Sequence, residues 1–270
     1  MSEPSEEGQF DERPPRNELR GGLFSGAAHD DPIEPAPEAR DQPLPGSGER
    51  AGPSAAPYLP TSRSLPVMRT AAQHCQGCEL YKRATQAVFG EGPANARAML
   101  VGEQPGDQED RKGRPFIGPA GAVLDQALRD AGIDRASVYL TNAVKHFKWS
   151  PRGKRRLHTK PGAIEIAACR PWLEAEIHSL RPVVLVALGA TAAQSLFGAS
   201  FRVLRDRGTL FSSDWAPRSM GTVHPSSILR ATDGASKEKA MADFVRDLRL
   251  VAAELARSEP AEGSTPAPPE

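Results

Sequence analysis

Residues 96–121, ARAMLVGEQPGDQEDRKGRPFIGPAG, are the stretch that decides the fold. Its first part, 96–103, is a continuous apolar run, which is typical of a parallel strand buried on both faces. A loop rich in glycine and proline follows, and residues 119–132 then show the spacing of an amphipathic helix. The stretch therefore predicts one strand-loop-helix unit of a larger α/β sheet.

Outward from this unit the same alternation continues. Further apolar runs at 137–144, 182–189 and 219–225 predict three more strands. Helical patterns occupy 164–180, 190–198 and 236–256. We therefore expect an α/β fold, a three-layer α/β/α sandwich with a central, mainly parallel four-stranded sheet. Ligands of such sheets lie outside the carboxyl ends of the strands.

Charge and composition divide the chain into three parts. Residues 1–50 hold twelve acidic residues against five arginines, while the whole chain has a net charge of zero. We interpret residues 1–64 as a disordered, acidic, proline-rich arm and residues 258–270 as a disordered tail, because neither shows a hydrophobic period. The predicted domain spans residues 65–257, which is long enough for one core.

The chain shows no apolar run that approaches the length of a membrane span and no signal-like N-terminus. We therefore expect a cytoplasmic protein that does not enter a membrane. Three cysteines, two of them in the CxxC motif of Cys75 and Cys78, argue against a disulfide framework. They favour a metal or redox role in a reducing compartment.

Unusual residues follow all four predicted strands. The strands end in GEQPG (102–106), TNAVKH (141–146), LGAT (188–191) and HPSSILR (224–230). Because the carboxyl ends of parallel strands meet at one edge of a sheet, these segments should lie together. The set predicts a ligand site at that edge.

These motifs resemble the uracil-DNA glycosylase superfamily. The carriers of the resemblance are GEQPGDQEDRKGRPFIGPAG, TNAVKHFKW, GKRRLHTKP and HPSSILR, and the match runs from Cys75 to Arg230 and into the last helix. GExPG, PFxGPAG and HPSS are similar to the iron-sulfur family 4 enzymes. Gln104 and the inserted loop GKRRLHTKP resemble the UdgX subgroup. The resemblance implies a glycosylase that excises uracil from DNA.

A uracil glycosylase draws its base into a pocket and reads the Watson–Crick edge. Phe116 offers a face for stacking, and the Asn142 amide can match the donor and acceptor of uracil but not those of cytosine. By resemblance, His224 donates to uracil O2, and backbone N–H groups from Gly102 to Gly106 help hold the leaving base. Taken singly, these residues could equally be core filler, a strand-end cap and a structural histidine.

HPSSILR also suits contact with DNA. Ser226, Ser227 and Arg230 can bind phosphates. Ile228 and Leu229 are predicted to form an apolar wedge that fills the gap left by the unstacked base, although both could instead fold back into the core.

The metal ligands follow from the resemblance. Family 4 enzymes hold a 4Fe-4S cluster with four cysteines, and VKH stands here where their VKC would stand. The resemblance therefore implies Cys75, Cys78, His146 and Cys169 as ligands of a structural cluster. The same set would suit zinc, His74 is the other candidate nitrogen, and a redox CxxC is a third interpretation.

His158 lies in the most basic part of the chain. Residues 145–160 contain seven lysines and arginines and no acidic residue, which is typical of a loop that grips phosphates. When uracil leaves, C1′ of the sugar resembles an oxocarbenium ion, and a neutral imidazole could attack it. By resemblance to the UdgX subgroup, Glu103 orients His158 and Gln104 lies near the sugar and base. We therefore predict a single-turnover enzyme that stays covalently attached through His158.

Two other functions remain open at this point. The first is a conventional turnover glycosylase in which Glu103 or Gln104 positions water and His158 is one more DNA contact. The second is a non-catalytic, metal-stabilised DNA-binding module. The expected partner is uracil-containing DNA, single- or double-stranded, and we expect a monomer.

Overall fold

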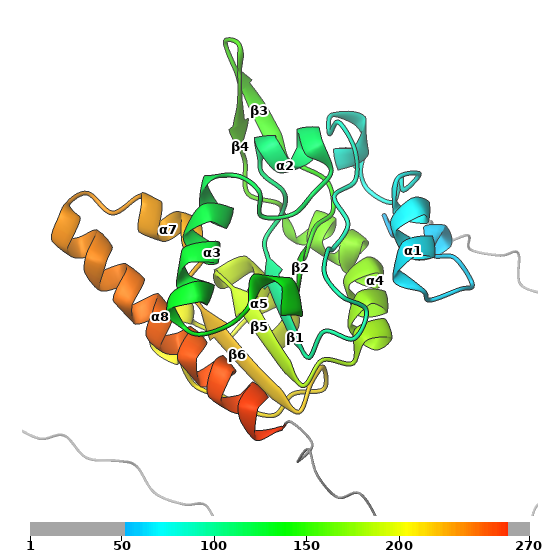
Figure 1. Ribbon diagram of the computed structural model, residues 1–270. Coiled ribbons are helices and arrows are strands. Elements are labelled where there is room, and N and C mark those ends of the chain that lie inside the picture. The colour runs from blue at the N-terminus through cyan, green and yellow to red at the C-terminus, as the bar shows by residue number, and fades with distance from the viewer. Residues whose placement is uncertain (1–51, 259–270) are drawn as a thin grey trace, which may run out of the picture. The chain divides into compact units, whose positions relative to one another are not determined.

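A four-stranded sheet with strand order β2-β1-β5-β6 lies at the centre of the fold (Figure 1). The computed structural model describes residues 52–258. Its sheet consists of β1 (Ala98–Gly102), β2 (Val138–Asn142), β5 (Val184–Leu188) and β6 (Arg218–Thr222). Every neighbouring pair runs parallel, so the predicted fold class is confirmed. Strands β1, β2 and β5 are buried at every position, as their continuous apolar sequences predict.

Helices cover both faces of the sheet. Alternate strand residues pack into two separate apolar clusters, one with α4 (Ala163–Leu180) and one with α3 (Pro119–Asp130) and α8 (Gly234–Arg257). This division produces the three layers visible in Figure 1. The remaining elements are η1 (Ala56–Tyr58), α1 (Leu65–Ala72), η2 (Glu79–Lys82), α2 (Asp107–Lys112), η3 (Arg135–Ser137), β3 (Trp149–Arg152), β4 (Arg155–His158), α5 (Ala190–Phe197), α6 (Val203–Asp206) and α7 (Pro225–Leu229).

The last strand is shorter than its sequence predicts. The apolar run 219–225 indicated a strand through Pro225, but β6 ends at Thr222 and α7 begins at Pro225. Proline fixes the φ angle of a first helical residue and lacks the N–H that a strand would need, so the chain turns into a helix there. His224 consequently stands at the N-cap of α7.

The basic segment is a β-hairpin rather than an irregular loop. β3 and β4 pair antiparallel, with Trp149 opposite His158 and Arg152 opposite Arg155. The two-residue connection begins at Gly153, whose φ of +58° is readily available only to glycine. In Figure 1 the hairpin extends away from the sheet beside α2.

Parts of the predicted arm and tail lie outside the described residues, namely 1–51 and 259–270. Residues 52–64, which we assigned to the arm, include η1, and Ala55 is buried there with its N–H donating to Ala168 O at 2.7 Å. Within residues 52–258, no helix is both long enough and apolar enough to cross a membrane.

Candidate active site

A cavity of about 810 Å³ lies at the carboxyl ends of the strands. Segments from all four strand ends and from β4 contribute to its wall, as the motif positions predicted. Among the lining residues are Glu103, Gln104, Gly106, Phe116, Asn142, His158, His224, Ser226 and Arg230. Of the predicted pocket and DNA-contacting residues, Gly102, Ser227 and Ile228 are not among them.

Gly102 determines how closely the pocket residues approach one another. A Cβ atom at Gly102 would lie 2.4 Å from Oδ1 of Asn142 and 2.7 Å from Cζ of Phe116. Only glycine leaves room for both side chains at the end of β1. Asn142 is 2% exposed, and its side-chain amide has no hydrogen-bond partner among residues 52–258. Its donor and acceptor are therefore available to a ligand.

Phe116 occupies a strained turn beside the cavity. Its φ of +54° is in the left-handed region, which is uncommon for a residue that is not glycine. The buried Glu109 carboxylate supports this turn by accepting the N–H groups of Ile117 at 3.1 Å and Gly118 at 2.8 Å. The Phe116 ring stacks with His224 at a centroid distance of 6.2 Å. Glu109 was not among the residues that sequence reasoning assigned to the site.

A buried ion pair supports Asn142 from below. Nζ of Lys145 lies 2.5 Å from Oε2 of Glu176 and donates to the backbone oxygen of Asn142 at 2.7 Å. Glu176 also accepts the Tyr139 hydroxyl at 2.9 Å, and burial together with this carboxylate raises the pKa of Tyr139. The end of β2 is thereby held by a network in which the buried charges are paired.

His224 is held as a neutral donor. The backbone N–H of Ser226 donates to Nδ1 of His224 at 3.2 Å, and the Ser226 hydroxyl lies 2.8 Å from the same atom. A lone pair at Nδ1 leaves the hydrogen on Nε2. Burial, followed by the charges of Arg230 and His158, lowers the pKa of His224 to about 4. The ring is thus uncharged at neutral pH and can donate from Nε2.

His158 lies in the cavity wall between two polar side chains. Its Nε2 is 2.8 Å from Nε2 of Gln104 and 3.4 Å from Oε1 of Glu103. The imidazole is half exposed, with 50% of its side-chain surface accessible. Gln104, which we expected near the sugar and base, lines the cavity and also contacts the hairpin, where its Oε1 accepts the N–H of Lys148 at 2.9 Å.

Thr191 is a cavity residue that sequence reasoning did not assign. Its hydroxyl donates to Oε2 of Glu103, so one oxygen of that carboxylate faces Thr191 while the other faces His158. Thr191 follows β5 in the segment LGAT, which the strand-end pattern had already placed at this edge.

The hairpin is attached to the domain through Arg156. The guanidinium bonds Asp107 at 2.5 Å and the fully buried Asp110 at 2.6 Å. It also lies over the rings of Phe147 and Trp149, 5.5 Å from each centroid. One of the basic residues that we expected to grip phosphate is therefore an internal anchor, and Arg156 and His158 share one face of β4.

Of the two residues in the predicted apolar wedge on α7, Leu229 lies at the surface and Ile228 does not. Ile228 is 1% exposed and belongs to the core, because a short helix starting at Pro225 turns that side chain inward. Leu229 is 42% exposed at the cavity rim. Arg230 donates to the Ser226 hydroxyl at 3.0 Å, and the exposed Ser227 donates to His224 O at 2.8 Å.

The predicted metal ligands lie close to one another in the α4 layer. Cys75 and Cys169 are buried in one apolar cluster against which Cys78 packs. Burial raises the pKa of the Cys169 thiol to about 12, and nearby Cys78 and Cys75 also raise it, against the opposing effect of Lys145. The N–H of Lys145 donates to Cys169 Sγ at 3.2 Å, which brings the adjoining, buried His146 to the same region.

Within the described part of the chain, no group of three or more His, Cys, Asp or Glu side chains is arranged so that it could hold a metal ion. The three thiols are nevertheless near enough to influence one another electrostatically. Three thiols and a nearby imidazole are donor types that can hold an iron-sulfur cluster or a zinc ion.

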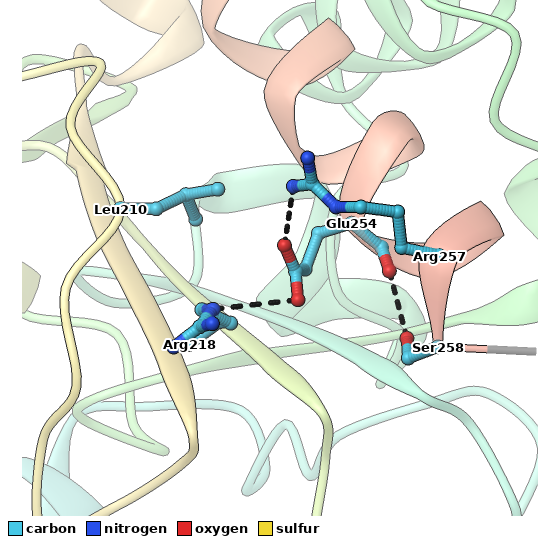
Figure 2. Close-up of a pocket in the computed structure, with 5 residues that line it drawn as sticks. All are labelled: Leu210, Arg218, Glu254, Arg257 and Ser258. Carbon is cyan, nitrogen blue, oxygen red and sulfur yellow. Dashed lines mark hydrogen bonds and ion pairs between the residues drawn. The ribbon is translucent and has the colours of Figure 1, made fainter.

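A second cavity, of about 660 Å³, lies at the amino end of β6 (Figure 2). Both arginines in its wall point at Glu254, with contacts of 3.3 Å from Arg218 and 2.5 Å from Arg257. Its remaining lining residues are Leu210 and Ser258. None of the predicted site residues lines this cavity, so the carboxyl-end cavity is the candidate active site.

Fold and cavity together define a class of protein. It is an α/β/α domain whose cavity at the strand ends offers a stacking ring, an unpartnered amide and the neutral donor His224. The profile of the uracil DNA glycosylase superfamily matches residues 89–249 of this chain. The protein belongs to that superfamily.

Individual relatives agree with this assignment. The type-4 uracil-DNA glycosylase of Thermotoga maritima is 38% identical over 62% of this chain and 83% of its own length. That of Pyrobaculum aerophilum is 34% identical over 66% of this chain and 88% of its own. A type-5 uracil-DNA glycosylase of Pyrobaculum aerophilum is 37% identical over a shorter match, 37% of this chain and 48% of that protein.

Proposed function

We propose that this protein excises uracil from DNA and then stays joined to the resulting abasic site through His158, as an enzyme of the UdgX subgroup would. Superfamily membership and the type-4 relatives support the excision. The observation that carries the trapping step is the position of His158, 3.4 Å from a carboxylate and in the wall of the same cavity as Phe116, Asn142 and His224.

Recognition of uracil rests on the unpartnered amide of Asn142. Uracil presents an acceptor at O4 and a donor at N3, which the two ends of an amide can satisfy together. Cytosine presents the reverse pattern and would leave buried polar groups unpaired. Phe116 stacks on the base, and His224 donates from Nε2 toward O2, where negative charge develops.

The trapping step exchanges one bond to C1′ for another. The glycosidic bond between C1′ and uracil N1 breaks, and its electron pair leaves with uracil, which takes a proton from solvent. A lone pair on one ring nitrogen of His158 then forms the new bond to the electron-poor C1′. The ring becomes cationic, and Glu103 or water accepts the proton from the other ring nitrogen. An N–C1′ bond of this type is not readily hydrolysed.

The hairpin contributes DNA contact through its outward face. Arg156 and His158 point to the domain, so the alternation of a strand turns Arg155 and Leu157 to the other side. Both are exposed there, near the exposed Lys154 at the turn. Cationic side chains of this kind contact phosphates irrespective of sequence.

Denaturing gel electrophoresis tests the trapping directly. Native protein incubated with a uracil-containing oligonucleotide should give a heat-stable shifted band that is absent with the matching thymine oligonucleotide. His158→Ala and His158→Ser should lose the band. Free abasic product without a shifted band would instead support a conventional turnover glycosylase, and intact uracil would support a non-catalytic DNA-binding module.

The cofactor that the donor set favours is a 4Fe-4S cluster held by Cys75, Cys78, His146 and Cys169. Its contribution is structural, because none of these residues lines the active-site cavity. The cluster would join the segment before the domain to α4 and to the end of β2. Iron and sulfide analysis with a visible absorption spectrum tests this assignment, and stoichiometric zinc without iron would contradict it.

A further inference from the structure

The Thr191 hydroxyl donates to the Glu103 carboxylate that contacts His158, and it has no other hydrogen-bond partner among residues 52–258. It comes from the start of α5, 88 residues away from Glu103 in sequence, and is 5% exposed. Hydroxyls at the start of a helix often cap the helix itself. Here the N-cap residue of α5 is Gly189, which makes no side-chain cap, and the Thr191 hydroxyl turns to Glu103 instead.

The contact constrains how the carboxylate can rotate. Oε2 of Glu103 accepts the Thr191 hydroxyl, and Oε1 is then the oxygen that faces Nε2 of His158. A carboxylate with 21% of its side chain exposed would otherwise rotate and bind water. A fixed carboxylate that accepts one ring N–H leaves the lone pair on the other ring nitrogen, as the orienting group does in other nucleophile–base–orienter sets.

We infer that Thr191 is a positioning residue for the trapping reaction, forming a chain of contacts from Thr191 through Glu103 to His158. This inference rests on the proposed function, because it concerns the same histidine. Thr191 does not touch the reacting atoms. Its effect is on how often an excision event ends in attack by His158 instead of attack by water.

The test compares Thr191→Val with Thr191→Ser. Valine keeps the branched shape and removes the hydroxyl, whereas serine keeps the hydroxyl. Thr222→Val is a matched control, because Thr222 is also buried and its hydroxyl donates to the Asp247 carboxylate at 2.5 Å. Thr222 does not line the cavity. Released uracil and covalent adduct are quantified separately from the same single-turnover reactions, and thermal melting monitors folding of each variant.

The expected result is a fall of about tenfold in the ratio of adduct to free abasic product for Thr191→Val, the size expected for a lost hydrogen bond to a charged group. Thr191→Ser should keep most of the ratio and Thr222→Val all of it. In a Glu103→Gln background, adding Thr191→Val should change the ratio little, because the two residues act as one unit.

The outcomes distinguish failure of the role inferred for Thr191 from failure of the proposed trapping reaction. An unchanged ratio in folded Thr191→Val, with wild-type protein forming adduct, overturns the role of Thr191 alone. An equal fall in Thr222→Val would assign the effect to general destabilisation and would also overturn it. If the wild-type protein releases uracil and forms no adduct, the proposed trapping itself fails, whatever the Thr191 variants do.

Discussion

Nε2 of Gln104 lies 2.8 Å from Nε2 of His158, and the surrounding backbone determines which way the amide points. Oε1 of Gln104 accepts the N–H of Lys148, while the amide nitrogen donates to Thr159 O at 3.0 Å. The amide nitrogen thus has two hydrogens for three nearby acceptors, namely Thr159 O, Lys148 O at 3.3 Å and the lone pair that Nε2 of His158 carries in one of its two tautomers. In the other tautomer Nε2 carries the hydrogen and can donate to Glu103, while the Gln104 amide keeps its bonds to Lys148 and Thr159.

Replacing Gln104 should consequently change trapping more than a distant substitution does. Gln104→Ala removes the contacts with Lys148, His158 and Thr159 at the base of the hairpin, so His158 spends less time beside Glu103. We expect the ratio of adduct to free abasic product to fall about tenfold, as for other orienting groups. Single-turnover gels with parallel measurement of released uracil provide the ratio. A ratio equal to that of wild type would show that Gln104 does not hold the hairpin.

The two neighbouring arginines of β4 should have different roles, Arg156 in attaching the hairpin to the domain and Arg155 in binding DNA. Arg156→Ala breaks the attachment to Asp107 and Asp110, and should reduce adduct formation strongly while leaving Asp110 as an unpaired buried carboxylate. Arg155→Ala is the matched variant on the outward face. It should weaken DNA binding and lower the salt slope by about one. Fluorescence anisotropy at several salt concentrations measures the slope, and equal slopes for both variants would refute this division.

Gly102→Ala should damage the pocket without altering the sheet. The added methyl would stand 2.4 Å from Asn142 and 2.7 Å from Phe116, so both side chains must move out of position. We expect uracil release to fall at least tenfold, since small displacements of binding groups cost about that much. Gly234→Ala is the control, because a Cβ there meets open space. Uracil release at the wild-type rate by Gly102→Ala would mean that the pocket tolerates this shift.

The pH dependence of excision should lack an inflection from His224. Burial lowers the pKa of its imidazole from 6.5 to about 4, so the ring stays a neutral donor as the pH falls through the usual histidine range. The same shift stabilises the fold fully above pH 6.5, and this stabilisation is lost as the pH falls from 6.5 toward about 4, because the unfolded chain binds the proton more tightly.

A His158→Ala background isolates this behaviour, since it removes the other imidazole in the cavity wall. Uracil release should be level down to about pH 5 and should decline only below it. An inflection near the ordinary histidine pKa would contradict the neutral, pre-set state of His224.

The buried pair of Lys145 and Glu176 should matter for stability. Glu176→Gln leaves the Lys145 ammonium buried without its carboxylate, which costs about 3 kcal/mol or more. Urea unfolding should detect this loss, while Glu174→Gln, which breaks the exposed pair with Arg170, should change stability by about 0.5 kcal/mol at most. Similar losses for both variants would mean that water reaches the inner pair.

Periodicity along the chain was sufficient to predict the sheet and the place of the site. Continuous apolar runs identified the four strands because parallel strands are buried on both faces, and the segments after them had to meet at one edge. Asn142, Phe116 and His224 could therefore be expected together, whereas His158 was placed with them by the resemblance to the UdgX subgroup. Their residue types and order also carried the resemblance to the superfamily.

Only the tertiary structure decided which side chains face one another. Strand alternation makes Arg156 an anchor and Arg155 a surface cation, although the two are neighbours of the same type. The turn at Pro225 buries Ile228 and exposes Leu229, and the crossover through α5 brings Thr191 to Glu103. Local patterns specify which face of an element is apolar, whereas contacts between residues far apart in sequence depend on how complete elements pack.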